Sequence, residues 1–245
     1  AFGWRAGVWG FAALALLMLP AAWVAGRVDA LPLPPQPGEG DSARAALGVA
    51  LRHPPFVVLA VTYFVCGMQL VFLTTHLPSY LEVCGMDPML GAQALGVIGG
   101  FNVLGSLFFG WAGGRWNKLV LLGSIYTLRS LALAWYFVAL PTPQSTMVFA
   151  AVMGFLWLGV APLVTGWIAE TFGLKWLAML AGIAFVGHQL GSFAGAFGGG
   201  LIFDLAGSYT LAWQIGVAVG LAAGTVQIGF ALAHGRTGPR RLRLG

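Results

Sequence analysis

Arg129 has the most distinctive chemistry in the chain, because it lies in the middle of an apolar run from about 119 to 140. It is about ten residues from either end, or roughly 15 Å at 1.5 Å per residue, which is too deep for its side chain to reach water easily. A guanidinium at that depth of a membrane span costs several kcal/mol unless it faces a partner or a water-filled cavity. Acidic residues lie only in loops or, as Glu170 and Asp204 do, at the ends of apolar runs. The counter-charge is therefore an anionic substrate, a group elsewhere in the protein, or backbone carbonyls and water, so a functional and a structural interpretation are both open.

His188 and Gln189 are a second polar pair, at mid-depth of the apolar run 177–203. A histidine there binds an anion when it is protonated, and it titrates near neutral pH, which suits proton coupling. The alternative is an interhelical hydrogen bond that fixes packing.

Gln69 and His76 follow Thr62 at seven-residue intervals in the run 55–78, so the three share one helix face. A polar face inside a span must meet protein or water, and a central pathway would supply water. Gln69 lies near the centre of the run and is the better pathway candidate, whereas His76 lies near an end, where a histidine costs little.

The elements that hold these residues are seven apolar segments, at about 5–25, 55–78, 91–113, 119–140, 145–168, 177–203 and 210–233. The chain is 59% hydrophobic and 8% charged, far from the roughly 25% charge of soluble domains, and this composition predicts a polytopic α-helical membrane protein. Pro162 predicts a kink in the fifth segment.

Other classes of function find no support in the residue pattern. Cys66 and Cys84 form no CxxC pair or metal-ligand spacing, so we expect neither a disulfide framework nor a metal site. The HExxH, GxSxG and P-loop signatures of enzymes are absent from the sequence, and we expect no catalytic residues and no cofactor. The net charge of +5 comes mostly from loop residues, which argues against nucleic-acid binding.

Glycines indicate close helix packing and an internal repeat. Gly187, Gly191, Gly195 and Gly199 recur every four residues and form one stripe on which another helix backbone can approach closely. Shifting 182–200 back by 86 residues places it on 96–114 with six of nineteen positions identical. Weak repeats of a few helices are typical of secondary transporters, whose substrate site lies at the repeat interface. In this alignment Asn102 takes the position of His188.

The basic residues predict the topology, because short cytoplasmic loops are enriched in them. Ten of the twelve lie after the first, third, fifth and seventh segments, and the intervening loops carry none. The start of the chain is therefore expected outside and the C-terminus in the cytoplasm. We predict a helix at 1–25, a cytoplasmic linker with a short helix at 26–53, a six-helix unit of three plus three at 54–233, and a basic tail at 234–245. Asp41 or Ser42 is the expected cap of the short helix, and the missing start methionine suggests a fragment.

The loop from Gly110 to Lys118, G-W-A-G-G-R-W-N-K, resembles a degenerate cytoplasmic loop signature of the major facilitator superfamily. That signature has Gly followed four residues later by Asp and then by basic residues. Here Gly114 replaces the Asp, so the gating role of the acid does not transfer, although Gly110, Arg115 and Lys118 match the rest of the motif.

The stretches 187–192, 199–209, 75–80 and 126–130 are similar to bacterial transporters related to monocarboxylate porters. This resemblance implies helix six followed by helices seven to twelve of a twelve-helix transporter, with a further half of the protein as partner. Helices seven, eight, ten and eleven line the pathway in that family, which favours Gln69, Asn102 and His188. Helix nine is peripheral there, so Arg129 would instead support helix eight or eleven.

We therefore expect secondary active transport of a small organic anion across a bacterial inner (plasma) membrane by alternating access, with protons as the candidate coupling ion of a symporter. Efflux of amphipathic compounds is an alternative within the same fold. A non-transporting membrane receptor or assembly subunit is an alternative from another class.

Overall fold

A computed structural model describes residues 3–27, 42–139 and 141–234, and the regular structure among them is entirely helical. Seven helical stretches are long and apolar enough to cross a membrane: Arg5–Val24, Pro54–Val83, Pro88–Gly113, Lys118–Val138, Pro143–Phe172, Leu177–Ala206 and Thr210–His234. Each overlaps one predicted segment, and the largest difference is at Val83, where the sequence predicts an end near 78. The prediction of an all-α polytopic membrane protein is confirmed.

The chain divides into two compact units, Ala1–Pro37 and Gly38–Gly245. The first contains α1 (Gly3–Leu17) and α2 (Leu19–Gly26), and its large apolar side chains, such as Trp9, Phe11 and Trp23, are exposed. A helix that presents apolar side chains on all sides needs apolar surroundings, as a membrane span has. Residues 28–41 of the predicted linker and 235–245 of the predicted tail lie outside the described residues.

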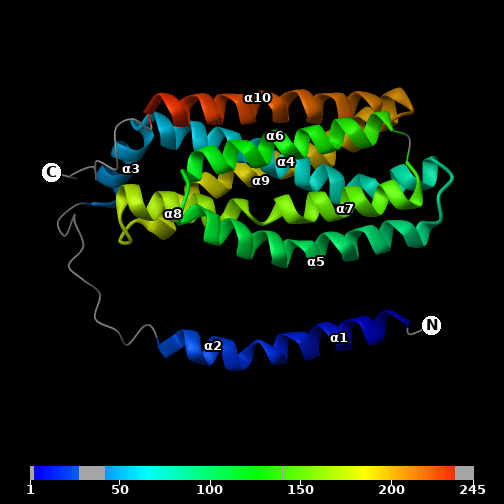
Figure 1. Cartoon of the computed structure of the whole chain (residues 1–245), viewed down its shortest axis with the longest axis horizontal. Coiled ribbons are helices and arrows are strands. Elements are labelled where there is room, and N and C mark those ends of the chain that lie inside the picture. The colour runs from blue at the N-terminus through cyan, green and yellow to red at the C-terminus, as the bar shows by residue number, and fades with distance from the viewer. Residues whose placement is uncertain (1–2, 28–41, 140, 235–245) are drawn as a thin grey trace. The chain divides into compact units, whose positions relative to one another are not determined.

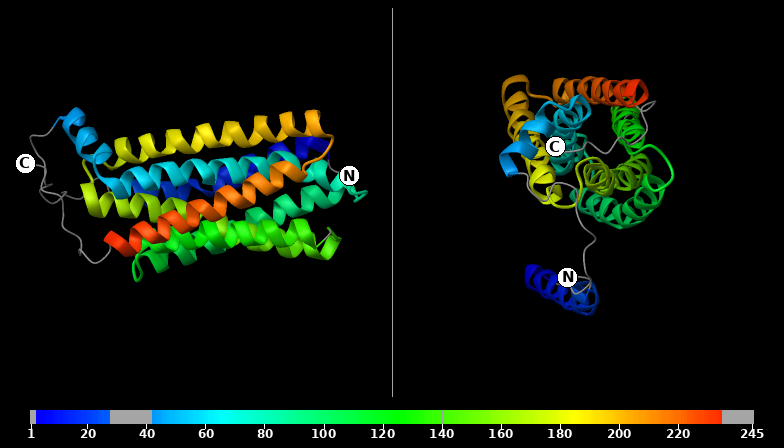
Figure 2. Two further views of the ribbon diagram at one scale, coloured as in Figure 1. Left: turned by 90° about the horizontal axis from the view of Figure 1, so that it is seen from above. Right: turned by 90° about the vertical axis from the view of Figure 1, so that its left-hand side faces the viewer.

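The second unit contains α3 (Ala43–Leu51), α4 (Pro54–Val83), α5 (Pro88–Gly113), α6 (Lys118–Val138), α7 (Pro143–Trp157), α8 (Val160–Phe172), α9 (Leu177–Ala206) and α10 (Thr210–His234). Its long helices run roughly side by side in a bundle (Figures 1 and 2). The helix starts carry the expected local signals, because the side chains of Ser42, Asp87, Asn117 and Thr142 accept hydrogen bonds from the first turns that follow them.

Helix pairing follows the internal repeat. α4 packs along α9, α5 packs along α7, and α6 packs along α10. Suppose that the first three spans of the unit (α4, α5 and α6) are exchanged with the last three (α7 with α8, α9 and α10). The α4–α9 pair then becomes the α7–α5 pair, and the α6–α10 pair is unchanged. The packing therefore has the two-fold character that a repeat of three plus three helices requires.

Close backbone contacts explain the glycine stripe. A Cβ built on Gly191 would overlap the carbonyl oxygen of Phe64 on α4, and one built on Gly105 would overlap the carbonyl oxygen of Phe155 on α7. Gly105 and Gly191 are equivalent in the 86-residue alignment, so both copies of the repeat use the same glycine to let two helices meet.

The fifth span is broken at Leu158 and Gly159, between α7 and α8. Pro162 lies four residues after Leu158 and has no N–H to donate to the Leu158 carbonyl, which accepts instead from the Ala161 N–H at 3.2 Å, and this accounts for the break that the sequence predicts. The free N–H of Leu158 donates to Asn102 Oδ1 on α5 at 3.2 Å, so a side chain from the facing helix compensates the interruption.

Candidate functional site

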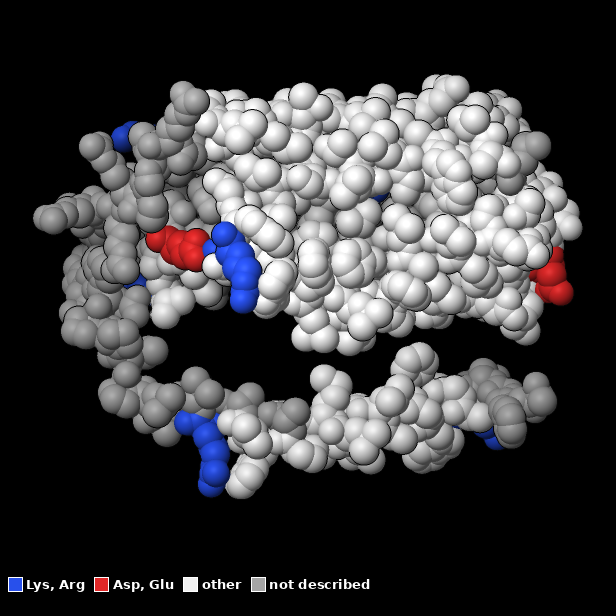
Figure 3. Space-filling view, viewed as in Figure 1, with Lys and Arg blue, Asp and Glu red and all other residues white. Residues whose placement is uncertain are grey.

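Several of the buried polar groups of the bundle lie on α4 or contact it, and α4 is the most buried of the described spans. Thr62, Gln69 and His76 share one face of α4, as their spacing predicts, and all three are buried inside the unit. Charged side chains lie instead near the ends of the bundle on the face that Figure 3 shows, with a predominantly uncharged middle. The polar face of α4 is therefore covered by other helices of this unit.

Gln69 connects α4 to α6 and α10. Its Nε2 donates to Ser130 Oγ at 3.0 Å and to the Gly216 carbonyl oxygen at 2.9 Å. Gly220 makes room for this pair, because a Cβ there would overlap both Ser130 Oγ and Gln69 Nε2. Gln69 Oε1 is buried and has no hydrogen-bond partner among the described residues.

Thr62 makes the second link from α4 to α10, through a hydrogen bond from its hydroxyl to Gln227 Oε1 at 2.9 Å. Gln227 is also buried. The two links place side-chain hydrogen bonds about two helical turns apart along α4, which fixes the register of α4 against α10.

His76 joins α4 to the second half of α9 and to the turn after it. Its Nε2 lies 2.9 Å from the Ala196 carbonyl oxygen, and its Nδ1 lies 3.3 Å from the Tyr209 hydroxyl. The carbonyl accepts only, so Nε2 carries the proton and Nδ1 accepts from the Tyr209 O–H. Both ring nitrogens are thus used in helix packing in this conformation.

Arg129 is 0% exposed and points from α6 to α4. Its Nη1 lies 3.2 Å from Cys66 Sγ, its Nη2 donates to the Cys66 carbonyl oxygen at 3.4 Å, and its Nε has no partner among the described residues. The sequence left open what compensates the charge of Arg129, and the described chain supplies a backbone carbonyl and a thiol. The hydrogen bonds go to α4, and not to α5 or α9, which the resemblance would equate with helices eight and eleven.

His188 and Gln189 lie on α9 near the middle of the span, and they differ from the groups above in exposure. Gln189 is exposed and His188 is half-buried. His188 Nδ1 lies 3.3 Å from Gln189 Oε1, and the imidazole stacks on Phe185 with 5.1 Å between ring centroids and meets the Tyr63 ring edgewise at 4.8 Å. Ser192, one turn on, donates to the His188 carbonyl oxygen at 2.9 Å. This cluster offers an imidazole, an amide and a hydroxyl on α9, near the middle of the helix.

The loop between α5 and α6 places its basic residues near one end of the bundle. Lys118 Nζ donates to Glu170 Oε1 at 2.6 Å, which ties this turn to the end of α8, and the Arg115 guanidinium lies 4.2 Å above the Trp111 ring. Gly110 lies in the last turn of α5, which ends at Gly113.

The structure brings His188 and Gln189 together, whereas Gln69, Asn102, Arg129 and His76 lie in separate hydrogen-bonded contacts. Sequence reasoning missed Cys66, Ser130 and Gln227 as partners. Ser130 and Gln227 carry a signal, because both are polar residues inside apolar runs, but the sequence does not show which helix each of them faces.

Comparison with known proteins gives a family match over most of the chain. The family profile described as Major Facilitator Superfamily matches residues 1–196. Monocarboxylate transporter 13 from Bos taurus and its counterpart from Rattus norvegicus are each 27% identical to the chain over 182 residues, which is 73% of this chain and 42% of the relative. The chain therefore spans less than half the length of these curated relatives.

Proposed function

Because the chain belongs to the Major Facilitator Superfamily, we propose that it acts, together with a first half such as its longer relatives contain, in secondary active transport of a small organic anion. The names of the similar proteins support a monocarboxylate-like substrate. Alternating access would arise from rocking of this half against the other about a central pathway.

The exposed polar cluster on α9 is the observation that carries this proposal. Gln189 is exposed next to half-buried His188, near the middle of a span of thirty residues. Polar side chains at that depth are stable only where they face protein or a water-filled cavity. We infer that this surface of α9 faces the substrate pathway, where His188 binds the anion or carries a proton and Gln189 supplies hydrogen bonds.

The remaining candidates take supporting roles in this proposal. Asn102 occupies the repeat-equivalent position on α5 and steadies the break in the fifth span, and Arg129 contributes positive potential from behind α4. Gln69 and His76 hold α4 against its neighbours. Arg115 and Lys118 belong to a cytoplasmic loop if the distribution of basic residues sets the orientation, with the chain start outside in a bacterial-type plasma membrane.

Uptake of small carboxylates by the complete protein in proteoliposomes, with and without an imposed pH gradient, tests the proposal. Gradient-dependent uptake that falls in His188→Ala, and that is retained in His234→Ala at the exposed end of α10, would support an anion and proton role for His188. If a folded protein takes up no carboxylate, the proposed substrate class is wrong.

One observation favours efflux of amphipathic compounds as the second candidate. Phe193 and Phe197 are exposed on α9 and stack on each other with 5.4 Å between ring centroids. Transport of apolar cations or neutral drugs, but not carboxylates, by the same proteoliposomes would select this candidate. Absence of any transport would favour a receptor or assembly subunit.

A further inference from the structure

Tyr63 on α4 contacts the polar cluster of α9 with its aromatic ring. The ring meets the His188 imidazole edgewise with 4.8 Å between centroids, and it lies 6.1 Å from the Phe185 ring. Phe185 in turn stacks on the imidazole. The three side chains therefore form one aromatic cluster between α4 and α9, and Tyr63 is the member that α4 supplies.

Backbone contacts on both sides of this cluster hold the two helices together. One turn after Tyr63, a Cβ built on Gly67 would overlap the His188 carbonyl oxygen. About one turn before Tyr63, a Cβ built on Gly187 would lie 3.0 Å from the Ala60 carbonyl oxygen. Because main-chain atoms of α4 and α9 meet at both levels, the Tyr63 ring is held beside the His188 ring.

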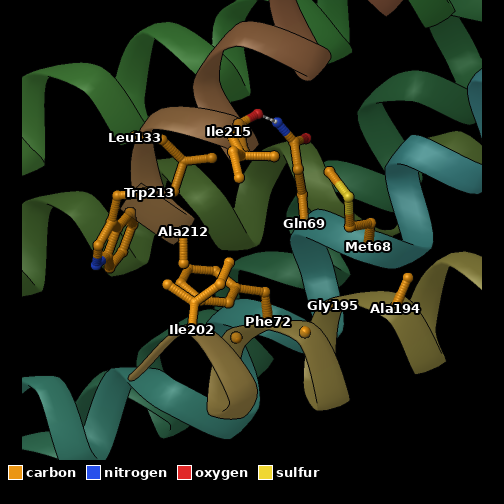
Figure 4. Close-up of a pocket in the computed structure, with 13 residues that line it drawn as sticks. Met68, Gln69, Phe72, Leu133, Ala194, Gly195, Ile202, Ala212, Trp213 and Ile215 are labelled. Carbon is orange, nitrogen blue, oxygen red and sulfur yellow. Dashed lines mark hydrogen bonds between the residues drawn. The ribbon is translucent and has the colours of Figure 1, made fainter. Parts of the chain in front are cut away.

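Tyr63 faces the inside of the bundle. It belongs to the apolar core that also contains Leu163 and Val164 of α8, whereas Val61, about 200° away around α4, is 63% exposed. Met68, about 140° from Tyr63 around the helix, lines the pocket that Figure 4 shows together with residues of α6, α9 and α10. That pocket therefore lies on another side of α4, apart from the aromatic cluster.

The Tyr63 hydroxyl is unpaired and is not enclosed. Tyr63 is 8% exposed, and its hydroxyl makes no hydrogen bond within the part of the chain that the structure describes. The hydroxyl of Tyr126, in contrast, is unpaired and completely covered. His188 Nε2 resembles the Tyr63 hydroxyl, because only Nδ1 of that imidazole lies near polar atoms of the described residues, those of Gln189 and Ser192. Two neighbouring rings from two helices thus each keep one polar atom that a ligand can pair with.

We propose that Tyr63 is a second substrate-binding residue, whose hydroxyl donates a hydrogen bond to the carboxylate that protonated His188 binds through its Nε2–H. This inference rests on the proposed function. A phenol and an imidazolium both donate, and a carboxylate accepts with two oxygens, so the donors and acceptors match. Because one donor belongs to α4 and the other to α9, the substrate is bound by both helices.

Tyr63→Phe is the direct test, because it removes the hydroxyl and keeps the ring against His188. Uptake of ¹⁴C-labelled glycolate, lactate and pyruvate by the complete protein in proteoliposomes, corrected for uptake by protein-free liposomes, gives the half-saturating concentration. A hydrogen bond to a charged group contributes about tenfold or more to affinity, so we expect Tyr63→Phe to raise that concentration about tenfold or more. The response to an imposed pH gradient should be retained, since His188 is unchanged.

Tyr126→Phe is the matched control, because it removes a hydroxyl that no substrate can reach. It should leave the half-saturating concentration unchanged. If Tyr63→Phe takes up too little substrate for a fit, the carboxylate concentration that raises its unfolding temperature in detergent measures the same loss of affinity, because a ligand that binds only the folded state stabilises it.

Three results would overturn the inference, and they separate it from the proposed function. An unchanged half-saturating concentration in Tyr63→Phe, with carboxylate uptake intact, means that the hydroxyl does not contact the substrate, and the proposed function then stands without Tyr63. An equal rise in Tyr126→Phe shows that the effect comes from a general change in α4 packing. If the unmodified complete protein takes up no carboxylate, the proposed substrate class is wrong and the role of Tyr63 is wrong with it.

Discussion

The contact between α9 and α4 predicts that alanine substitutions along α9 change the stability of the protein by different amounts at different positions. A Cβ at Gly182 meets no atom of another described element within 4 Å, one at Gly187 lies 3.0 Å from the Ala60 carbonyl oxygen, and one at Gly191 overlaps the Phe64 carbonyl oxygen. All three glycines are helical, so each alanine gains about 0.5–1 kcal/mol from the lower backbone entropy of the unfolded chain.

Packing opposes that gain by different amounts. Gly182→Ala should keep the full gain. Gly187→Ala requires a shift of a few tenths of an ångström and should change stability little. Gly191→Ala forces α9 away from α4, and overpacking of this kind costs about 1–3 kcal/mol, so the net result is a loss of up to about 2.5 kcal/mol.

Thermal unfolding of the three purified variants in one detergent, with the unmodified protein beside them, measures the series. We expect the unfolding temperature to decrease in the order Gly182→Ala, Gly187→Ala, Gly191→Ala. Gly105→Ala should behave like Gly191→Ala, because the repeat places it against the Phe155 carbonyl oxygen. If Gly191→Ala is as stable as Gly182→Ala, the close backbone approach is wrong.

Two further predictions concern single residues. Asn102→Ala leaves the Leu158 N–H without its acceptor and should lower stability by about 1 kcal/mol, whereas Asn102→Asp retains an acceptor and should lose less; equal losses in thermal unfolding would contradict this role. His53 lies against Trp167 and Phe172 before the start of α4, and burial, with the charge of a histidine at the end of α10, lowers its pKa below 6.5. Since the unfolded chain then binds the proton more readily, this contribution to stability is complete above pH 6.5 and is lost as the pH falls below it, so His53→Gln should unfold with a weaker pH dependence between about pH 5 and 7. An unchanged pH dependence would refute the assignment.

The sequence predicts the spans well because membrane crossing is a local requirement of length and apolarity. It also predicts the repeat, since Gly105 and Gly191 must be small wherever the two helix pairs meet. It does not predict the partner of Arg129, because Cys66 is one of many apolar-looking residues on α4 and lies 63 positions away. The same limit applies to Gln69, whose spacing shows which face it shares but not that α6 and α10 cover that face. Which side chains meet depends on how the helices pack, and the pattern of polar residues along one helix does not show this.

The burial of Arg129 is compatible with an electrostatic role in transport even though its guanidinium contacts no exposed surface of the described unit. It lies against the Cys66 carbonyl on one side of α4, and a helix with its side chains is about 10 Å across. At an effective dielectric constant of about 20, a unit charge attracts an anion one helix diameter away by about 1.7 kcal/mol, which is more than a tenfold change in affinity. An arginine that faced the pathway directly would hold an anion more tightly and release it more slowly. In the arrangement that we propose, with the pathway across α4 from Arg129, the charge would favour anions over neutral molecules, while the exchangeable contacts would be left to His188 and Gln189 on α9.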